Sequence, residues 1–191
     1  MNLMAFVIVV VLIIAYQLMK RHSEPVTPLP SSKPDIAKIK VRLFMSNYTQ
    51  QSLRARSDSL FLFGDNLDHA GTKGQAIIRY EPNAAGIVTK IKPSSSGDSY
   101  MSDDSYDDNC QHIDSSFDDV YRRLALRTST GDLYTTIYLP RGGLGTGLAK
   151  LPEKAPKTFV YLMGKIYDLV EDLDPAQLDG VVGKWIQSFI S

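Results

Sequence analysis

The sequence predicts a single α/β domain in which helices flank a mixed sheet, and three features of the chain indicate this class. Apolar runs of strand length at residues 59–63 and 133–139 each end in a turn. Apolar residues recur with helical spacing over residues 114–127 and 155–173, so helices alternate with strands. A chain of 191 residues with 43% hydrophobic residues is long enough to bury one such core.

The apolar start of the chain predicts a transmembrane anchor over residues 1–22. Residues 3–19 carry no charge, and at about 1.5 Å per residue a helix of this length approaches the thickness of the bilayer hydrocarbon. Lys20 and Arg21 follow directly, which orients the N-terminus outward and the body of the chain toward the cytoplasm. A cleaved signal peptide and a buried core helix are the alternatives. No Lys or Arg precedes the run and no small-x-small cleavage site follows it, which disfavours the signal peptide.

Residues 23–35 predict a spacer between this anchor and the domain. The segment SEPVTPLPSSKPD holds four prolines, which remove hydrogen-bond donors and favour extended backbone. The α/β domain is therefore expected over residues 36–191.

The first half of the domain shows three strand patterns and one helix pattern. Residues 39–44 (IKVRLF) alternate apolar and basic side chains, which is typical of a half-buried strand. Thr49 is a suitable N-cap for a short helix over 49–56. Residues 59–63 (SLFLF) are apolar throughout and predict a central strand that ends at Gly64-Asp65-Asn66, and residues 86–92 predict a further strand.

The second half continues the alternation. A helix over 114–127 precedes a strand over 133–139, and the helix over 155–173 has Pro156 near its start, where a missing N–H is tolerated. The apolar stripe of residues 180–191 is expected to dock on the domain, with a contact to the membrane interface as the alternative.

Residues 93–119 predict an acidic insertion on the surface of the domain. Eight aspartates lie between Asp98 and Asp119, without any Lys or Arg. A calcium site is disfavoured because the spacing lacks the central Gly and terminal Glu of an EF-hand loop.

Composition excludes several classes of function. A net charge of zero removes the long-range attraction expected of a general nucleic-acid binder, and no nucleic-acid partner is predicted. The single cysteine, Cys110, excludes disulfides and thiolate zinc sites, and its acidic neighbours disfavour a reactive thiolate. His22, His69 and His112 lie far apart, so neither a metal site nor any other cofactor is predicted.

Two glycine-rich segments follow apolar strands and predict a ligand site. They span residues 61–76 and 138–151, and because ligands bind beyond the carboxyl ends of strands in α/β sheets, both loops are expected at one rim. Exposed backbone N–H groups there would bind an anion, and Arg141 would add a positive charge. Neither loop is a Walker A motif or a typical dinucleotide motif. The predicted ligand-binding residues are Gly64, Asn66, Gly74, Gln75, Asn83, Arg141, Gly142, Gly143, Gly145, Thr146, Gly147 and Leu148.

Asp65 and Lys90 are the candidate catalytic residues. Asp65 ends a buried strand and is suited to be a general base, while Lys90 ends another strand and could stabilise an anion or act as a nucleophile. The alternative is structural: Asp65 is a good turn former, Lys90 a solvated edge residue, and the two loops are tight turns. His69 is expected to be a solvent-exposed loop residue.

Two stretches of the chain resemble known families. FGDNLDHAGTKGQAIIRYEPNAAGIVTK (63–90) and PRGGLGTGLAKLPEKAP (140–156) look like small uncharacterised proteins of tailed bacteriophages and their bacterial hosts, and the resemblance covers roughly residues 41–173. More distantly, Gly145-Thr146-Gly147-Leu148 resembles the phosphate-binding loop of macrodomains of the terminal ADP-ribose glycohydrolase type. That resemblance implies a macrodomain-like fold and an ADP-ribose ligand. The chain departs from it at Ala149, where those enzymes carry an acid.

These observations predict a membrane-anchored accessory protein of phage type, held in the host inner membrane if phage-encoded. Its partners would be the bilayer, through residues 3–19, and a nucleotide or ADP-ribose-like molecule at the two loops, with hydrolysis of an ADP-ribose linkage left open. The alternative is a non-enzymatic phage protein that binds or inhibits a host membrane partner.

Overall fold

The computed structural model describes residues 39–126, 128 and 131–190. The predicted anchor (1–22) and spacer (23–35) lie outside these residues. Within the described ranges, no helix is both long enough and apolar enough to cross a membrane.

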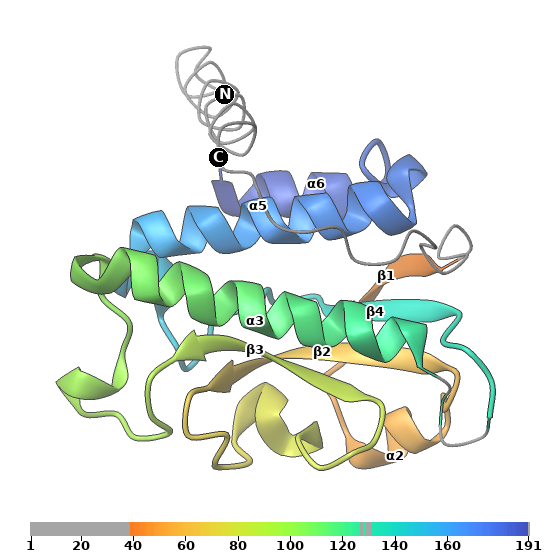
Figure 1. Cartoon of the computed structure of the whole chain (residues 1–191), viewed down its shortest axis with the longest axis horizontal. Helices are drawn as coiled ribbons and strands as arrows, with labels where there is room; N and C mark the ends of the chain where they lie inside the picture. The colour runs from red at the N-terminus through yellow and green to blue at the C-terminus, as the bar shows by residue number, and fades with distance from the viewer. Residues whose placement is uncertain (1–38, 127, 129–130, 191) are drawn as a thin grey trace, which may run out of the picture.

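A four-stranded sheet forms the centre of the domain (Figure 1). Its order is β1-β4-β2-β3 and all its pairings are parallel. The predicted α/β class with flanking helices is confirmed, but the expected mixed sheet is wrong, because each connection passes over a face of the sheet and brings the chain back to the same end. The strands are β1 (Lys40–Phe44), β2 (Ser59–Asn66), β3 (Ala84–Lys90) and β4 (Thr136–Pro140).

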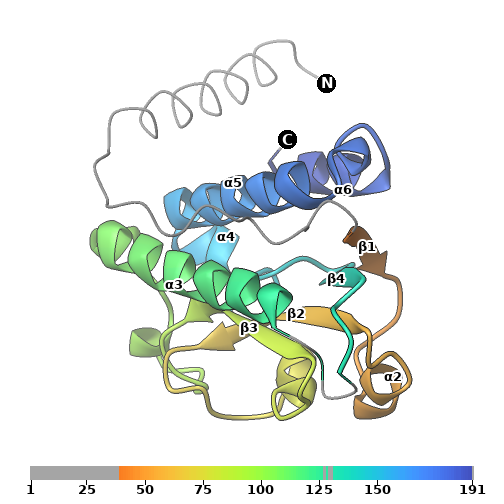
Figure 2. The same cartoon turned by 45° about the vertical axis from the view of Figure 1, so that its right-hand side comes forward.

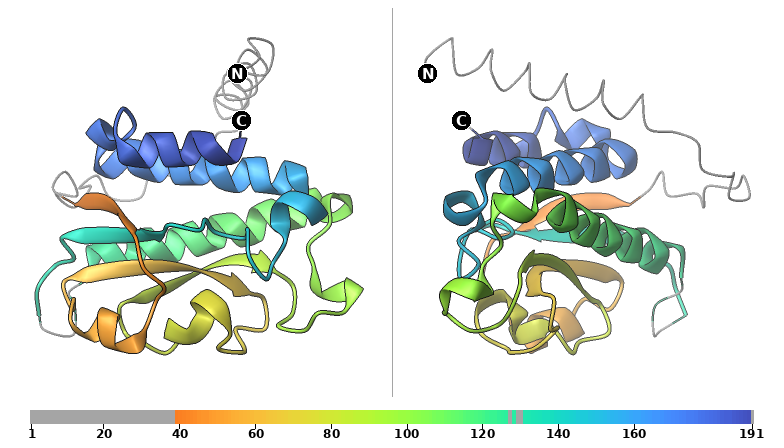
Figure 3. Two further views of the ribbon diagram at one scale, coloured as in Figure 1. Left: turned by 180° about the vertical axis from the view of Figure 1, so that it is seen from behind. Right: turned by 60° about the vertical axis from the view of Figure 1, so that its left-hand side comes forward.

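Helices cover both faces of the sheet (Figures 2 and 3). One face carries α3 (Tyr106–Ala125), α5 (Pro156–Leu173) and α6 (Val181–Ile190), and the other carries the short α2 (Gln50–Arg54) and the 3-10 helix η1 (Gly74–Ile78). The remaining short helices are η2 (Gly97–Ser99), η3 (Asp103–Ser105), α4 (Leu151–Lys154) and η4 (Pro175–Gln177).

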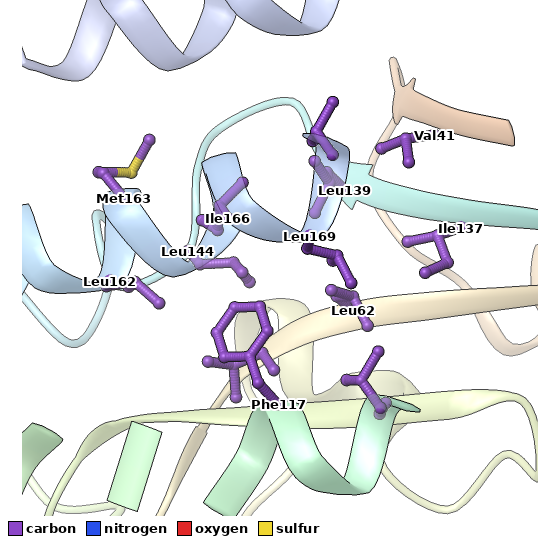
Figure 4. Close-up of a cluster of buried hydrophobic side chains, with 14 of the residues drawn as sticks. Val41, Leu62, Phe117, Ile137, Leu139, Leu144, Leu162, Met163, Ile166 and Leu169 are labelled. Carbon is purple, nitrogen blue, oxygen red and sulfur yellow. The ribbon is translucent and has the colours of Figure 1, made fainter. Parts of the chain in front are cut away.

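Two hydrophobic cores result, one on each face. In the larger core, Phe117 of α3 and Leu169 of α5 meet Leu62 and Ile137 of the sheet (Figure 4). The smaller core contains Phe61 and Phe63, together with Phe44, Tyr48, Leu53, Ala76, Ile78 and Ala84. Since successive side chains of a strand point to opposite faces, the apolar run of β2 supplies both cores.

Most predicted elements are present with shifted ends. β2 continues through Asp65 to Asn66, beyond the turn expected at Gly64, because these residues still pair with β3. The C-terminal stripe forms α6, whose Val182, Trp185 and Ile186 are buried. The expected docking of this segment on the domain is therefore observed.

The acidic segment differs most from expectation. The expected surface insertion over 93–119 is a loop only at its start, because α3 begins at Tyr106 and packs against β3 and α5. The Asp103 carboxylate accepts hydrogen bonds from the N–H groups of Lys157 (2.8 Å) and Thr158 (3.0 Å) and from the Thr158 hydroxyl (2.9 Å). The start of α5 has no N-cap side chain of its own, so Asp103 caps it from the acidic segment.

We expect Asp103→Ala to lower the free energy of unfolding at pH 7 by about 1 kcal/mol, the usual worth of a helix cap. Burial alone would raise the pKa of Asp103, but the hydrogen bonds from Lys157 and Thr158 outweigh it and the pKa is lowered. The stabilisation is thus present above the unfolded-state pKa of about 3.9 and is lost as the pH falls through the folded-state value. Urea unfolding at several pH values measures the difference between variant and wild type.

Asp104→Ala is the matched control, since the Asp104 carboxylate accepts from the Ser102 hydroxyl at the surface. An equal loss of stability in both variants would contradict the cap. So would a difference in the free energy of unfolding between Asp103→Ala and wild type that persists at strongly acidic pH.

Candidate functional site

The carboxyl ends of β2 and β4 lie next to each other at one rim of the sheet. These strands are parallel neighbours, so they end on the same side. After β2 the chain passes to the face that carries η1, whereas after β4 it passes to the face that carries α4 and α5. Neighbouring strands whose connections leave toward opposite faces form a switch point, and open α/β sheets bind ligands in the crevice expected between such strand ends.

The two glycine-rich loops meet in this crevice through Gln75. The Gly64 N–H donates to Gln75 Oε1 (3.0 Å), and Gln75 Nε2 donates to the Gly143 carbonyl (2.8 Å). Leu148 lies against Gly74, where an added Cβ would be 3.4 Å from its Cδ1. The predicted ligand-binding residues Gly64, Gly74, Gln75, Gly143 and Leu148 are thus brought together.

The second loop has backbone N–H groups that the described residues leave without an acceptor, and one of them lies close to Gly64. Gly143 and Gly145 have φ values of 88° and 77°, which favour glycine. The Gly145 carbonyl accepts from Leu151 N–H and the Gly142 carbonyl from the Thr146 hydroxyl. Within the described part of the chain, the N–H groups of residues 144–147 have no acceptor. Gly145 is buried, and its nitrogen lies 3.6 Å from where a Gly64 Cβ would be.

Helix α6 supports this loop from outside, which the sequence did not indicate. Trp185 Nε1 donates to the Arg141 carbonyl (2.7 Å). The Phe189 ring lies so close to Gly143 that an added Cβ would be 2.8 Å from it. The Arg141 side chain remains exposed at the surface, and Gly142 and Gly147 have open space where a Cβ would be.

The Asp65 side chain lies on the opposite face of the sheet from the second loop. One carboxylate oxygen accepts from the Arg79 guanidinium and from the Asn66 N–H (2.6 Å), and the other lies 2.9 Å from His69 Nδ1. Arg79 is nearly buried and also donates to the carbonyls of Gly71 and Ala70. Asp65 therefore organises the first loop through Arg79 and His69, two partners that the sequence did not assign to it.

The remaining candidates have mostly structural contacts. Asn66 Nδ2 donates to the Ala70 carbonyl (2.9 Å) within the first loop. Asn83 precedes β3 and is not brought to the crevice; its amide donates to three carbonyls, those of Leu53, Arg56 and Ser59. Buried Lys90 donates to the Ser94 carbonyl (2.6 Å), and its ammonium stands 4.4 Å from the Tyr100 ring centroid.

A separate cavity of about 480 Å³ runs along the outer edge of β3. Its walls come from β2 and β3, the first loop and α3, and its polar lining includes Asp65, His69, Arg79, His112, Arg122 and Arg123. No residue of the second glycine loop lines it.

Neither a metal centre nor a reactive thiol is found among the described residues. No group of three or more His, Cys, Asp or Glu side chains there could hold a metal ion. Burial, followed by the charges of Asp114, Asp107 and Asp103, raises the pKa of Cys110 to about 11 despite a hydrogen bond with Tyr106. Its thiol is therefore a poor nucleophile near neutral pH.

Comparison with known proteins yields one match. The model of a family of unknown function (DUF7831) matches residues 43–165. No curated protein and no solved structure matches the chain. The expectation of an uncharacterised family is confirmed, while the phage setting and the macrodomain resemblance stay predictions.

We expect Gln75→Glu to separate the two loops. The new carboxylate keeps an acceptor for the Gly64 N–H but faces the Gly143 carbonyl oxygen, where the amide had donated. The lost bond and the repulsion should cost about 1–3 kcal/mol and speed amide hydrogen exchange at Gly143, Lys150 and Leu151, whose N–H groups donate within the second loop. Gln51→Glu, at an exposed position of α2, is the control. Unchanged exchange in Gln75→Glu would show that this bridge does not hold the loops.

Proposed function

The chain belongs to the DUF7831 family, whose function is unknown, and we propose that its domain binds the phosphate groups of a nucleotide, with ADP-ribose as the first candidate. The ligand would lie in the crevice between the ends of β2 and β4. The observation that carries this proposal is the run of N–H groups at residues 144–147 that have no acceptor in the described part of the chain, of which the one at Gly145 lies beside Gly64.

Backbone geometry supports an anionic ligand. Successive N–H groups that converge on one point form a concavity for anions, and a phosphate supplies the acceptors that the protein does not. The absence of a side chain at Gly64 keeps the approach to the Gly145 N–H open, because a Cβ there would lie 3.2 Å from Thr89 Oγ1 and 3.6 Å from the Gly145 nitrogen. The resemblance of Gly145-Thr146-Gly147-Leu148 to a macrodomain phosphate loop agrees with this chemistry.

Two lysines add positive charge to the same rim. Lys90 ends β3, and Lys154 lies in α4, directly after the second loop. Their ammonium groups stand 4.4 Å and 5.6 Å from the centroid of the Tyr100 ring. Neither is paired with a carboxylate in the residues described. A ligand with two negatively charged phosphate groups suits this surplus of positive charge better than a neutral ligand.

The arrangement supports binding more than turnover. The carboxylate of Asp65, the expected base, is engaged by Arg79 and His69 on the other face of the sheet. Ala149 stands where the macrodomain-type enzymes carry an acid. Hydrolysis of an ADP-ribose linkage therefore lacks an assigned acid or base in the crevice, and the proposal is limited to recognition of the nucleotide.

Calorimetric titration of the full-length chain with ADP-ribose, ADP, ATP and NAD tests the proposal. We expect micromolar binding of one of them, weakened by about tenfold or more in Gly147→Val, because the Gly147 N–H is one of those without an acceptor and a Val side chain would occupy the open space around this residue. Gly147 is preferable to Gly145 for this test, because φ at Gly145 is 77° and a Cβ there would press on Leu151.

Gly97→Val is the matched control, because Gly97 also has open space around it but lies in the acidic segment. Absence of heat with all four ligands at millimolar concentration would contradict the proposal. It would favour the alternative function, a non-enzymatic protein that binds a host membrane partner.

We further propose that residues 1–22 anchor the domain on the cytoplasmic side of a membrane, where nucleotides are available. A reporter that is active only in the cytoplasm, fused after Ser191, should be active, and the chain should remain with membranes after an alkaline wash. A version that starts at Lys33 is the control and should be released. If instead a reporter that works only outside the cytoplasm were active after Ser191, the topology would be the reverse of the proposed one. The domain would then have no access to cytoplasmic nucleotides.

A further inference from the structure

We propose that the cavity along the outer edge of β3 is a second binding site, for a small phosphate monoester, and that His69 contacts its phosphate group. This inference is independent of the proposed nucleotide site. Consecutive residues of β2 separate the two sites, because Gly64 faces the second glycine loop while the Asp65 side chain lines the cavity.

The cavity has the size and lining of a small-molecule site. Its volume of about 480 Å³ lies within the range of ligand pockets. Phe63, Leu67 and Val88 supply apolar surface for the carbon part of a ligand, and the polar groups gather on the first loop and on α3.

The charges of the lining favour an anion. Arg79 is matched by Asp65, but Arg122 and Arg123 share the single carboxylate of Asp119, at 2.9 Å and 2.6 Å. The lining thus holds three guanidinium groups against two carboxylates, with no Lys or Glu. Arg122 and Arg123 both retain N–H donors that Asp119 does not use, and guanidinium groups bind phosphate through such pairs of donors.

His69 is held with one ring nitrogen available. Asp65 also accepts from Arg79 and from the Asn66 N–H, so it acts as a carboxylate and the Nδ1 of His69 carries the proton of their 2.9 Å contact. Nε2 is left for a ligand, and it donates to a phosphate when the ring is protonated. Asp65 is in this respect a positioning residue.

Backbone conformation supports this assignment. His69 has a φ of 48°, in the left-handed region that few non-glycine residues occupy, and its N–H donates to the Asn66 carbonyl (3.0 Å). Such conformations cost energy and concentrate at binding sites. The Asp65 carboxylate can lie against β3 only because residue 86 is glycine, since a Cβ there would collide with it.

Titration of the full-length chain with phenyl phosphate, followed by NMR, tests this site. We expect shifts of the His69 and His112 ring signals and of α3 amides, with millimolar affinity, and no such shifts with phenol. The double variant Arg122→Gln/Arg123→Gln should weaken binding about tenfold or more, since two charge-assisted contacts are lost. His69→Gln should weaken the binding of phenyl phosphate to a smaller extent, and the shifts of the α3 amide signals should remain.

Arg56→Gln is the matched control, because Arg56 is exposed and its guanidinium lies over the Phe44 ring, away from the cavity. Thermal unfolding checks that each variant folds. No shifts with phenyl phosphate, or affinity unchanged in the double variant, would overturn the proposal. Shifts confined to residues 143–147 would also overturn it, and would instead agree with the nucleotide site, so the two proposals fail separately.

Discussion

The burial of β2 on both faces and along both edges is the constraint on which the rest of the domain depends. The strand lies between β4 and β3, and its apolar side chains supply both cores. Both faces must therefore be covered by helices, and in this fold the chain leaves the neighbouring ends of β2 and β4 toward opposite faces. The meeting of the two glycine-rich loops at one rim is a consequence of this layering, because these loops follow β2 and β4.

The end of β2 borders both proposed sites because successive side chains of a strand point to opposite faces. The Gly64 N–H donates to Gln75, and Gly64 lies beside the Gly145 nitrogen of the second loop, while the Asp65 carboxylate contacts Arg79 and His69 on the opposite face. A buried ion pair such as Asp65–Arg79 contributes little net stability, but either partner alone would be costly to bury. Its clearest effect is to hold the first loop, and so to fix both the position of Gln75 and the ring of His69.

The matched family region covers the sheet rim but not all of its supports. Residues 43–165 include both glycine loops, Lys90 and the Asp65–Arg79 pair. Helix α6 lies beyond the matched residues, yet Trp185 and Phe189 hold the second loop from outside. In this chain the C-terminal helix therefore belongs to the support of the second glycine loop.

Local patterns in the sequence determined the elements and their order. The apolar runs and helical spacings predicted every strand, and the glycine-rich strand exits correctly marked the two loops that meet at Gln75 and Gly143. These features depend on residues close together in the chain. The tertiary structure alone decided that the sheet is parallel throughout, that Asp103 caps α5, that Asp65 pairs with Arg79 and His69, and that Trp185 supports Arg141. The physical reason is that each of these four features depends on which face of the sheet a segment crosses. The periodicity of a strand shows that Gly64 and Asp65 face opposite sides, but it does not show which residues either one will contact.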